Sequence, residues 1–139
     1  MKSNHAKLLA ILLVYALTNH FVQAAPHNAM NKDVLNALLT GNTIIGTHLN
    51  KGFKFDMYLK RDGTLIEKRE DRVIAGTWRV NDKGKFCWNY KHKEKTWCLW
   101  VINNGDRTYT NVKKKNGSLT KVRQFKVFDG NIRSLYLPR

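Results

Sequence analysis

Three histidines beyond residue 24 are the side chains best suited to move protons near neutral pH, namely His27, His48 and His92. Two imidazoles that face one cleft, with a lysine to hold a phosphate, would supply the acid and the base of a ribonuclease-like site. The spacing of His48 and His92 along the chain does not require such a cleft. We therefore interpret all three as solvated surface residues, and a small secreted nuclease is the least favoured of three hypotheses about function.

Sequence signatures of other enzyme classes are missing. Beyond residue 24 the serines are Ser118 and Ser134, and neither lies in the Gly-x-Ser-x-Gly turn of a serine hydrolase. The aspartates lie mostly in or beside turns, where they bond their own backbone, so a paired-carboxylate glycosidase site has no support. The sequence has no phosphate-binding glycine loop and no calcium loop. We predict no catalytic residue, no metal site and no cofactor, and we favour a binding protein over an enzyme.

Positive charge is the strongest compositional signal. Lysine and arginine number 25 against 10 aspartates and glutamates, which gives a formal net charge of +15 at pH 7. Lysines gather at two expected turns, and the candidate anion-binding residues are Lys91, Lys93, Lys95, Lys113, Lys114 and Lys115. Basic clusters beside aromatic residues can bind polyanions, and they can equally form a solvated surface. Suitable partners are anionic components of a cell envelope, such as lipopolysaccharide or lipid headgroups. Another is an acidic protein that this protein would bind and inhibit. Nucleic acid is a less favoured partner.

The N-terminal residues have the pattern of a secretory signal peptide. Two lysines precede an apolar run at residues 8–17, which is too short to cross a membrane. Residues 22–24 then offer small or medium side chains at the positions that a signal peptidase inspects. We predict a signal peptide at 1–24, cleaved after Ala24, and a periplasmic or secreted mature protein of about 115 residues. No later segment is apolar enough to span a bilayer, and the length suggests one domain and a monomer.

The two cysteines, Cys87 and Cys98, are expected to form a disulfide, because an even number of cysteines in a secreted chain favours pairing. The segment between them is polar in its middle and has Trp88 and Trp97 at its ends, which is typical of a hairpin. A four-residue loop at 91–94 would place Cys87 opposite Cys98 and Trp88 opposite Trp97. The spacing is not Cys-x-x-Cys and no histidine pair completes a zinc set, so a redox or metal pair is disfavoured.

From residue 43 onward apolar residues alternate with polar ones, which is typical of half-buried antiparallel strands. Asn-Gly and Asp-Gly pairs are among the turn signals that separate these segments. We expect strands at 43–49, 53–60, 64–70, 73–80, 85–91, 96–103, 107–114 and 119–128, and the pattern also allows a short ninth strand at 132–137. Because every connection is short, we predict an all-β fold, an eight-stranded antiparallel up-and-down barrel that closes to remove exposed edges. A two-sheet sandwich is the alternative.

A single short helix is expected before the strands. Asn31 can cap this helix and Gly41 can end it. Its apolar face comprises Val34, Leu35, Leu38 and Leu39. The helix would plug one end of the barrel, which gives an N-terminal tail and helix at 25–42 and a barrel domain at 43–139.

Large apolar side chains are expected inside the barrel. The candidate cavity residues are Phe55, Met57, Trp78, Trp88 and Tyr90. Eight-stranded barrels either fill their interior with side chains or hold one small ligand. The favoured hypothesis is therefore a small hydrophobic or amphipathic ligand in this cavity. If the barrel is filled, the alternative is a surface interaction through the basic loops.

The order of several short motifs resembles a known family. Leu38-Leu39-Thr40-Gly41-Asn42-Thr43 is followed by the Asp62-Gly63 turn, by Gly76-Thr77-Trp78-Arg79-Val80, by the two cysteines and by a late Asn-Gly turn. This order resembles the uncharacterised secreted proteins of proteobacteria grouped as domain of unknown function 995. The architecture is similar to lipocalin-like calycin barrels, whose Gly-x-Trp motif normally lies near the first strand and here lies on the fourth. The resemblance covers residues 35–128. It implies a periplasmic or secreted barrel with no established activity and no catalytic residues.

Overall fold

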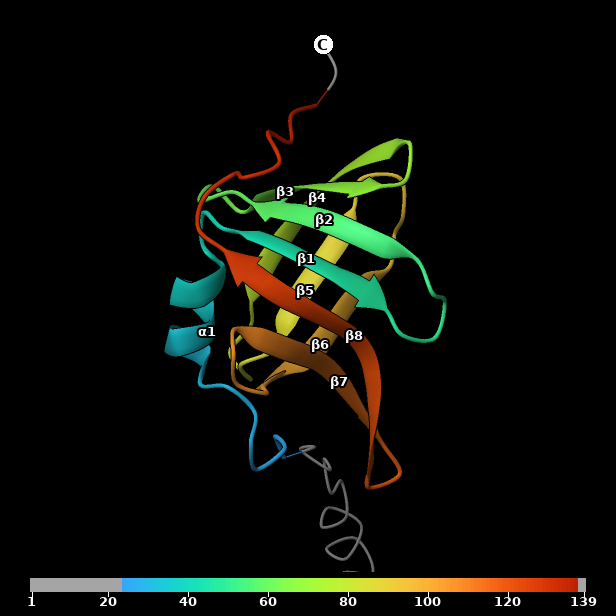
Figure 1. Ribbon diagram of the computed structural model, residues 1–139. Coiled ribbons are helices and arrows are strands. Elements are labelled where there is room, and N and C mark those ends of the chain that lie inside the picture. The colour runs from blue at the N-terminus through green and yellow to red at the C-terminus, as the bar shows by residue number, and fades with distance from the viewer. Residues whose placement is uncertain (1–23, 138–139) are drawn as a thin grey trace, which may run out of the picture.

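The strands form a closed barrel. The computed structural model describes residues 24–137, and Figure 1 shows its antiparallel strands wound into one ring. They are β1 (Thr43–His48), β2 (Lys54–Leu59), β3 (Thr64–Arg69), β4 (Arg72–Val80), β5 (Phe86–Tyr90), β6 (Thr96–Asn103), β7 (Thr108–Lys115) and β8 (Ser118–Phe128). Each strand pairs with its neighbours in sequence, and β1 pairs with β8 to close the ring. The predicted eight-stranded barrel is confirmed. The predicted signal peptide lies outside the described residues, apart from Ala24.

Short turns explain why sequence neighbours pair. Asn116 and Gly117 connect β7 to β8 with φ angles of 50° and 79°, the positive values that a tight hairpin needs. All eight strands begin and end within one residue of the predicted bounds. The ninth strand that the pattern allowed at 132–137 does not form, and this segment is irregular. A closed barrel has no free edge to which such a strand could add.

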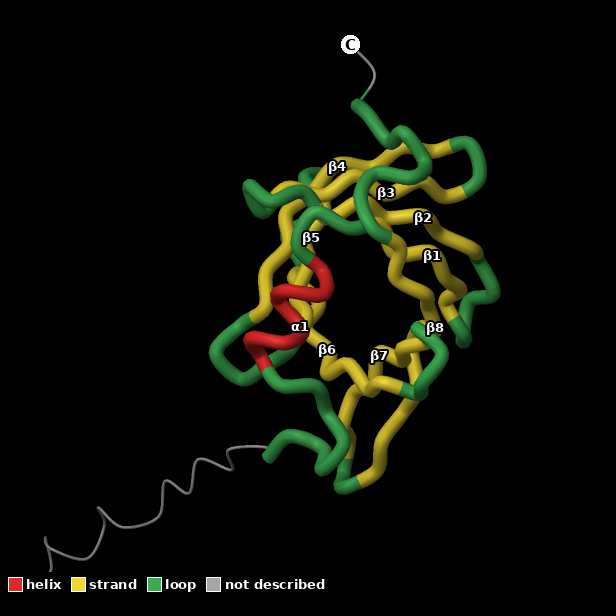
Figure 2. Tube along the Cα trace, turned by 60° about the vertical axis from the view of Figure 1, so that its left-hand side comes forward, coloured by secondary structure: helices red, strands yellow, loops and turns green. Residues whose placement is uncertain are grey.

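The helix α1 (Lys32–Leu39) closes one end of the barrel. The side-chain oxygen of Asn31 caps it, because it accepts a hydrogen bond from a backbone N–H of the first turn at 2.8 Å. Leu35 and Leu39 are fully buried and belong to the barrel core. Figure 2 shows the helix at one end of the ring of strands. The predicted helix is confirmed, but Val34 is 58% exposed, because the row formed by Leu35 and Leu39 is the one that faces the barrel.

Apolar side chains fill the half of the barrel next to α1. This core includes Phe55, Met57, Leu59, Leu65, Trp78 and Phe86, all buried.

Two glycines let neighbouring strands approach each other closely. A Cβ atom at Gly76 would lie 2.0 Å from the carbonyl oxygen of Asn89, and one at Gly46 would lie 2.2 Å from the carbonyl oxygen of Gln124. No larger residue fits at either position without moving the backbone.

The predicted disulfide joins β5 to β6 on the outer face of the barrel. Cys87 lies opposite Cys98 and Trp88 opposite Trp97, as predicted. The two Sγ atoms are 2.05 Å apart and the two Cα atoms 4.1 Å apart, a close approach typical of a non-hydrogen-bonded strand pair. Because side chains alternate between the two faces of a strand, the outward cysteines leave both tryptophans pointing inward. The disulfide thus holds a hairpin that supplies an aromatic wall to the interior.

Replacing both cysteines by alanine should lower the free energy of unfolding by about 2–3 kcal/mol, because the crosslink closes a loop of about 12 residues in the unfolded chain. Urea denaturation followed by tryptophan fluorescence measures this loss. Wild-type protein reduced before denaturation is the control, and it should lose a similar amount. A double variant with the urea midpoint of the oxidised wild type would contradict this expectation.

Candidate functional site: the open mouth of the barrel

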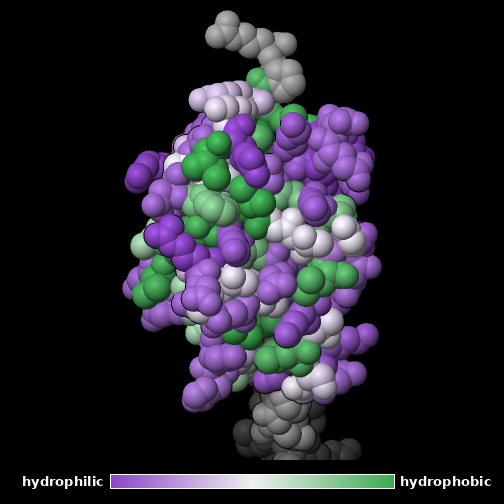
Figure 3. All heavy atoms as spheres, viewed as in Figure 1, coloured by the Kyte–Doolittle hydropathy of each residue, from purple (hydrophilic) through white to green (hydrophobic). Residues whose placement is uncertain are grey.

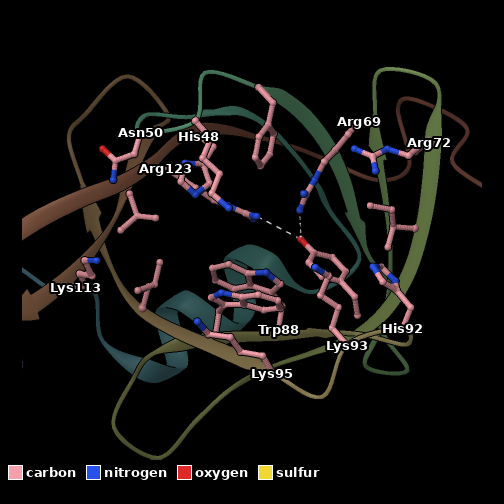
Figure 4. Close-up of a pocket in the computed structure, with 17 residues that line it drawn as sticks. His48, Asn50, Arg69, Arg72, Trp88, His92, Lys93, Lys95, Lys113 and Arg123 are labelled. Carbon is pink, nitrogen blue, oxygen red and sulfur yellow. Dashed lines mark hydrogen bonds between the residues drawn. The ribbon is translucent and has the colours of Figure 1, made fainter.

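The end of the barrel opposite α1 is open. The β1–β2, β3–β4, β5–β6 and β7–β8 connections surround it, because successive connections of an up-and-down barrel alternate between its two ends. A pocket of 580 Å³ opens between these loops, within the usual range for small-molecule sites. We call it the mouth pocket, and its lining residues are His48, Asn50, Lys51, Phe53, Arg69, Arg72, Ile74, Trp88, Tyr90, His92, Lys93, Lys95, Trp97, Leu99, Lys113, Val122 and Arg123. Figure 4 shows these side chains converging on the pocket, with the helix behind them at the far end.

A buried carboxylate lies just beneath the floor of the mouth pocket, where it bonds two lining residues but does not line the pocket itself. Glu67 is fully buried, and its Oε2 accepts a hydrogen bond from the Tyr90 hydroxyl at 2.5 Å, while its Oε1 accepts one from Arg69 Nε. Arg69 Nη2 also donates to the Tyr90 oxygen at 2.6 Å. Arg123 Nη1 lies 3.9 Å from Glu67 Oε2. Burial, and after it the charge of Glu67, raises the pKa of Tyr90, so the phenol stays protonated and donates its hydrogen.

The guanidinium of Arg123 lacks a full set of partners. The residue is 3% exposed, yet its Nε and Nη1 have no hydrogen-bond acceptor among the described residues. Its Nη2 donates to the Tyr90 hydroxyl over a long 3.3 Å. The centroids of the Phe55 and Trp88 rings lie 4.6 and 4.4 Å from its Cζ atom, so the cation lies over both rings. A shift in the β7–β8 pairing makes Val122 an extra residue, and such bulges redirect the neighbouring side chains.

Positive charge surrounds an aromatic wall in the mouth pocket. Seven of the lining residues are lysine or arginine, and none of the lining residues is aspartate or glutamate. The rings of Trp88 and Trp97 stack with centroids 6.2 Å apart and planes 15° apart. Lys95 Nζ lies 5.6 Å from the centroid of the Trp97 ring, at the exposed rim. The pocket therefore suits a molecule that has both an apolar body and a negative charge.

The structure divides the five predicted cavity residues between two places. Trp88 and Tyr90 line the mouth pocket. Phe55, Met57 and Trp78 instead pack in the filled core, and the Trp78 indole N–H donates to the carbonyl oxygen of Lys60 at 2.9 Å. The alternation of residues shows which side chains point inward. It does not show how far each lies from the open end.

The predicted anion-binding lysines are also divided. Lys93, Lys95 and Lys113 line the mouth pocket. Lys91 and Lys115 are exposed on the loops beside it, and Lys114 is half-buried. Sequence reasoning missed the floor residues Glu67, Arg69 and Arg123. A signal for them existed, because Arg123 shares the inward face of its strand with Phe125 and Val127, and Glu67 shares that of Leu65.

Two of the histidines line the same pocket: His92 is exposed, as expected of a surface residue, whereas His48 is half-buried. His48 and His92 both line it, and Figure 4 places them on opposite walls. The His48 ring lies 5.1 Å from the Phe53 ring, and the His92 ring stacks on Tyr90 at 6.1 Å. Burial, and after it the charge of Arg123, lowers the pKa of His48, so its imidazole is neutral at neutral pH.

Within residues 24–137 no group of three or more His, Cys, Asp or Glu side chains is arranged to hold a metal ion. In the same range, no helix has the length and hydrophobicity needed to cross a membrane.

A scan against protein-family models finds no match to this sequence, and a search of curated proteins finds no significant match either. The resemblance to the domain of unknown function 995 family stays a prediction.

Replacing His48 by phenylalanine should reduce the acid sensitivity of the fold. Because the pKa of His48 is lowered from its ordinary 6.5, the unfolded chain takes up this proton at a higher pH than the folded protein does. The free energy of unfolding of the wild type should therefore decrease as the pH falls from about 6.5 towards the lowered pKa. His48→Phe should decrease less over that interval. Urea midpoints measured from about pH 7.5 to 5 test this, and parallel curves for the two proteins would contradict it.

Proposed function

We propose that this protein binds a small amphipathic anion in the mouth pocket and is a binding protein, not an enzyme. One observation carries the proposal: a 580 Å³ pocket is lined by seven basic residues, no carboxylate and a stacked tryptophan pair. The basic residues would attract the charged group of the ligand. The aromatic wall would remove its apolar body from water.

The concave shape of the site favours a small ligand over a polyanion. A ligand inside a pocket is shielded from water on several sides, which strengthens charge attraction as well as apolar burial. Figure 3 shows that hydrophilic side chains cover most of one face of the molecule, with apolar residues in smaller groups between them. The mouth pocket offers Trp88, Trp97 and Leu99 as apolar lining. An apolar ligand body thus has a better contact surface in the pocket than on that face.

A periplasmic or secreted location and a monomeric state belong to the same proposal, with removal of a signal peptide after Ala24. The close Cys87–Cys98 pair supports it, because disulfides persist in oxidising compartments. The closed barrel with a short helix and the order of motifs support kinship with the domain of unknown function 995 family and with lipocalin-like barrels.

Contact with a polyanion is the second candidate function. The β7–β8 hairpin carries Lys113, Lys114 and Lys115, and it projects beyond the ring of strands in Figure 1. Such a hairpin could contact an anionic envelope component outside the pocket. Binding of this kind weakens steeply as salt is added.

The fluorescent probe 8-anilinonaphthalene-1-sulfonate tests the first candidate, because it combines an aromatic body with one negative charge. We expect one probe per protein, with micromolar affinity and energy transfer from the tryptophans. The triple variant Lys93→Gln, Lys95→Gln and Lys113→Gln should weaken probe binding several-fold and flatten its salt dependence, because three rim charges are lost.

The matched control removes the same total charge away from the mouth, by Lys83→Gln, Arg107→Gln and Lys126→Gln. These residues are exposed and do not line the mouth pocket. The control should bind the probe nearly as the wild type does. An equal loss in both triple variants would show an effect of net charge alone, and no probe binding by the wild type would refute the first candidate. Heparin that binds the wild type without displacing the probe would support the polyanion contact instead.

A further inference from the structure

We infer that the ligand enters with its acidic group first and that Arg123, at the floor of the mouth pocket, binds a single negative charge on that group. This inference rests on the proposed function and deepens it. The ligand class is a monoanionic amphiphile, such as a carboxylate or a sulfonate with an apolar body.

Burial decides between the floor and the rim as the place of the acidic group. Arg123 is 3% exposed and has two guanidinium nitrogens without an acceptor among the described residues. Buried donors without acceptors are costly, so an anion that accepts from Nε and Nη1 would remove a cost that already exists in the free protein. Lys93, Lys95 and Lys113 are exposed at the rim, where water and salt screen their attraction. An acidic group is therefore stabilised more by binding at the floor than by binding at the rim.

The charges at the floor add up to one missing anion. Arg69 and Arg123 contribute two positive charges, and Glu67 contributes one negative charge. Glu67 already accepts hydrogen bonds from Arg69 and Tyr90, and Arg69 also donates to Tyr90, so the charge of Arg69 is paired with Glu67. His48, the neighbouring titratable group, is neutral at neutral pH and leaves this balance unchanged. One added negative charge makes the floor neutral. A dianion would place a second negative charge there, beside Glu67.

The contacts of Arg123 also define the path of the ligand. Phe55 and Trp88 lie against the guanidinium, and its Nε and Nη1 are the unpartnered nitrogens, so these two nitrogens are where an acidic group would bind. The apolar body would then lie along the stacked Trp88 and Trp97 rings towards the loops. Lys95, which lies over the Trp97 ring, is at the exposed end of this path.

The test compares amphiphiles that differ in the head group alone, each below its micelle concentration. Dodecanoate, dodecanol and dodecyl phosphate compete with the bound fluorescent probe on the full disulfide-bonded protein near pH 8. Dodecanoate should displace the probe at a concentration about tenfold or more below that of dodecanol, as expected for one charge-assisted hydrogen bond. Dodecyl phosphate, a dianion at this pH, should do no better than dodecanoate.

Three variants locate the head group. Arg123→Met leaves Glu67 paired with Arg69, so the floor is neutral, and it should abolish the preference for dodecanoate over dodecanol. The rim triple variant should still prefer dodecanoate, by a smaller margin, because it loses the attraction of three rim charges but keeps the floor. Glu67→Gln adds one net positive charge to the floor, so it should shift the preference towards dodecyl phosphate. Glu67→Gln keeps the inference testable if Arg123→Met does not fold.

The inference is overturned if the wild type binds dodecanol as tightly as dodecanoate. It is also overturned if the rim triple variant loses the preference while Arg123→Met keeps it, because the head group would then lie outside. An unshifted preference in Glu67→Gln would likewise count against it. In each of these cases the wild type still binds the anionic probe, so the proposed binding of an amphipathic anion in the mouth pocket survives. Absence of binding by the wild type would refute the proposed function itself.

Discussion

The buried carboxylate of Glu67 constrains the rest of the barrel interior. A carboxylate removed from water has to be paired and hydrogen-bonded, and Arg69 and Tyr90 meet this demand. Arg123 brings a second cation close to the same group, so the pairing leaves one positive charge in excess. The ring of Trp88 stabilises that cation but supplies no acceptor to its Nε and Nη1. The interactions that make the open half of the barrel stable therefore also prepare it for an anion.

The fold leaves this excess positive charge near the end of the barrel that is open to a ligand. The helix α1 seals one end with Leu35 and Leu39, so the mouth is the side from which a ligand can approach. In the closed ring every strand is paired on both sides, which restricts its movement. The Cys87–Cys98 disulfide in addition holds the hairpin that carries Trp88 and Trp97. Groups that are fixed before binding cost less conformational entropy when the ligand arrives. Architecture and charge thus favour the same site.

Local rules account for how much could be predicted from the sequence. A period of two and turn residues such as Asn116-Gly117 determine strands and register, and all eight strands fall within one residue of expectation. The period of two carries no information on depth along the barrel axis, which is why Phe55 and Met57 belong to the core and not to the pocket. The floor joins Glu67 of β3, Tyr90 of β5 and Arg123 of β8, and their contacts depend on ring closure and on the bulge in β8.

The most direct test of how the ligand binds is a crystal structure of the disulfide-bonded protein with dodecanoate. The account predicts a carboxylate oxygen within about 3.2 Å of Nε or Nη1 of Arg123, with the alkyl chain along Trp88 and Trp97 towards the loops. A carboxylate on the rim lysines, with the chain directed into the barrel, would contradict it.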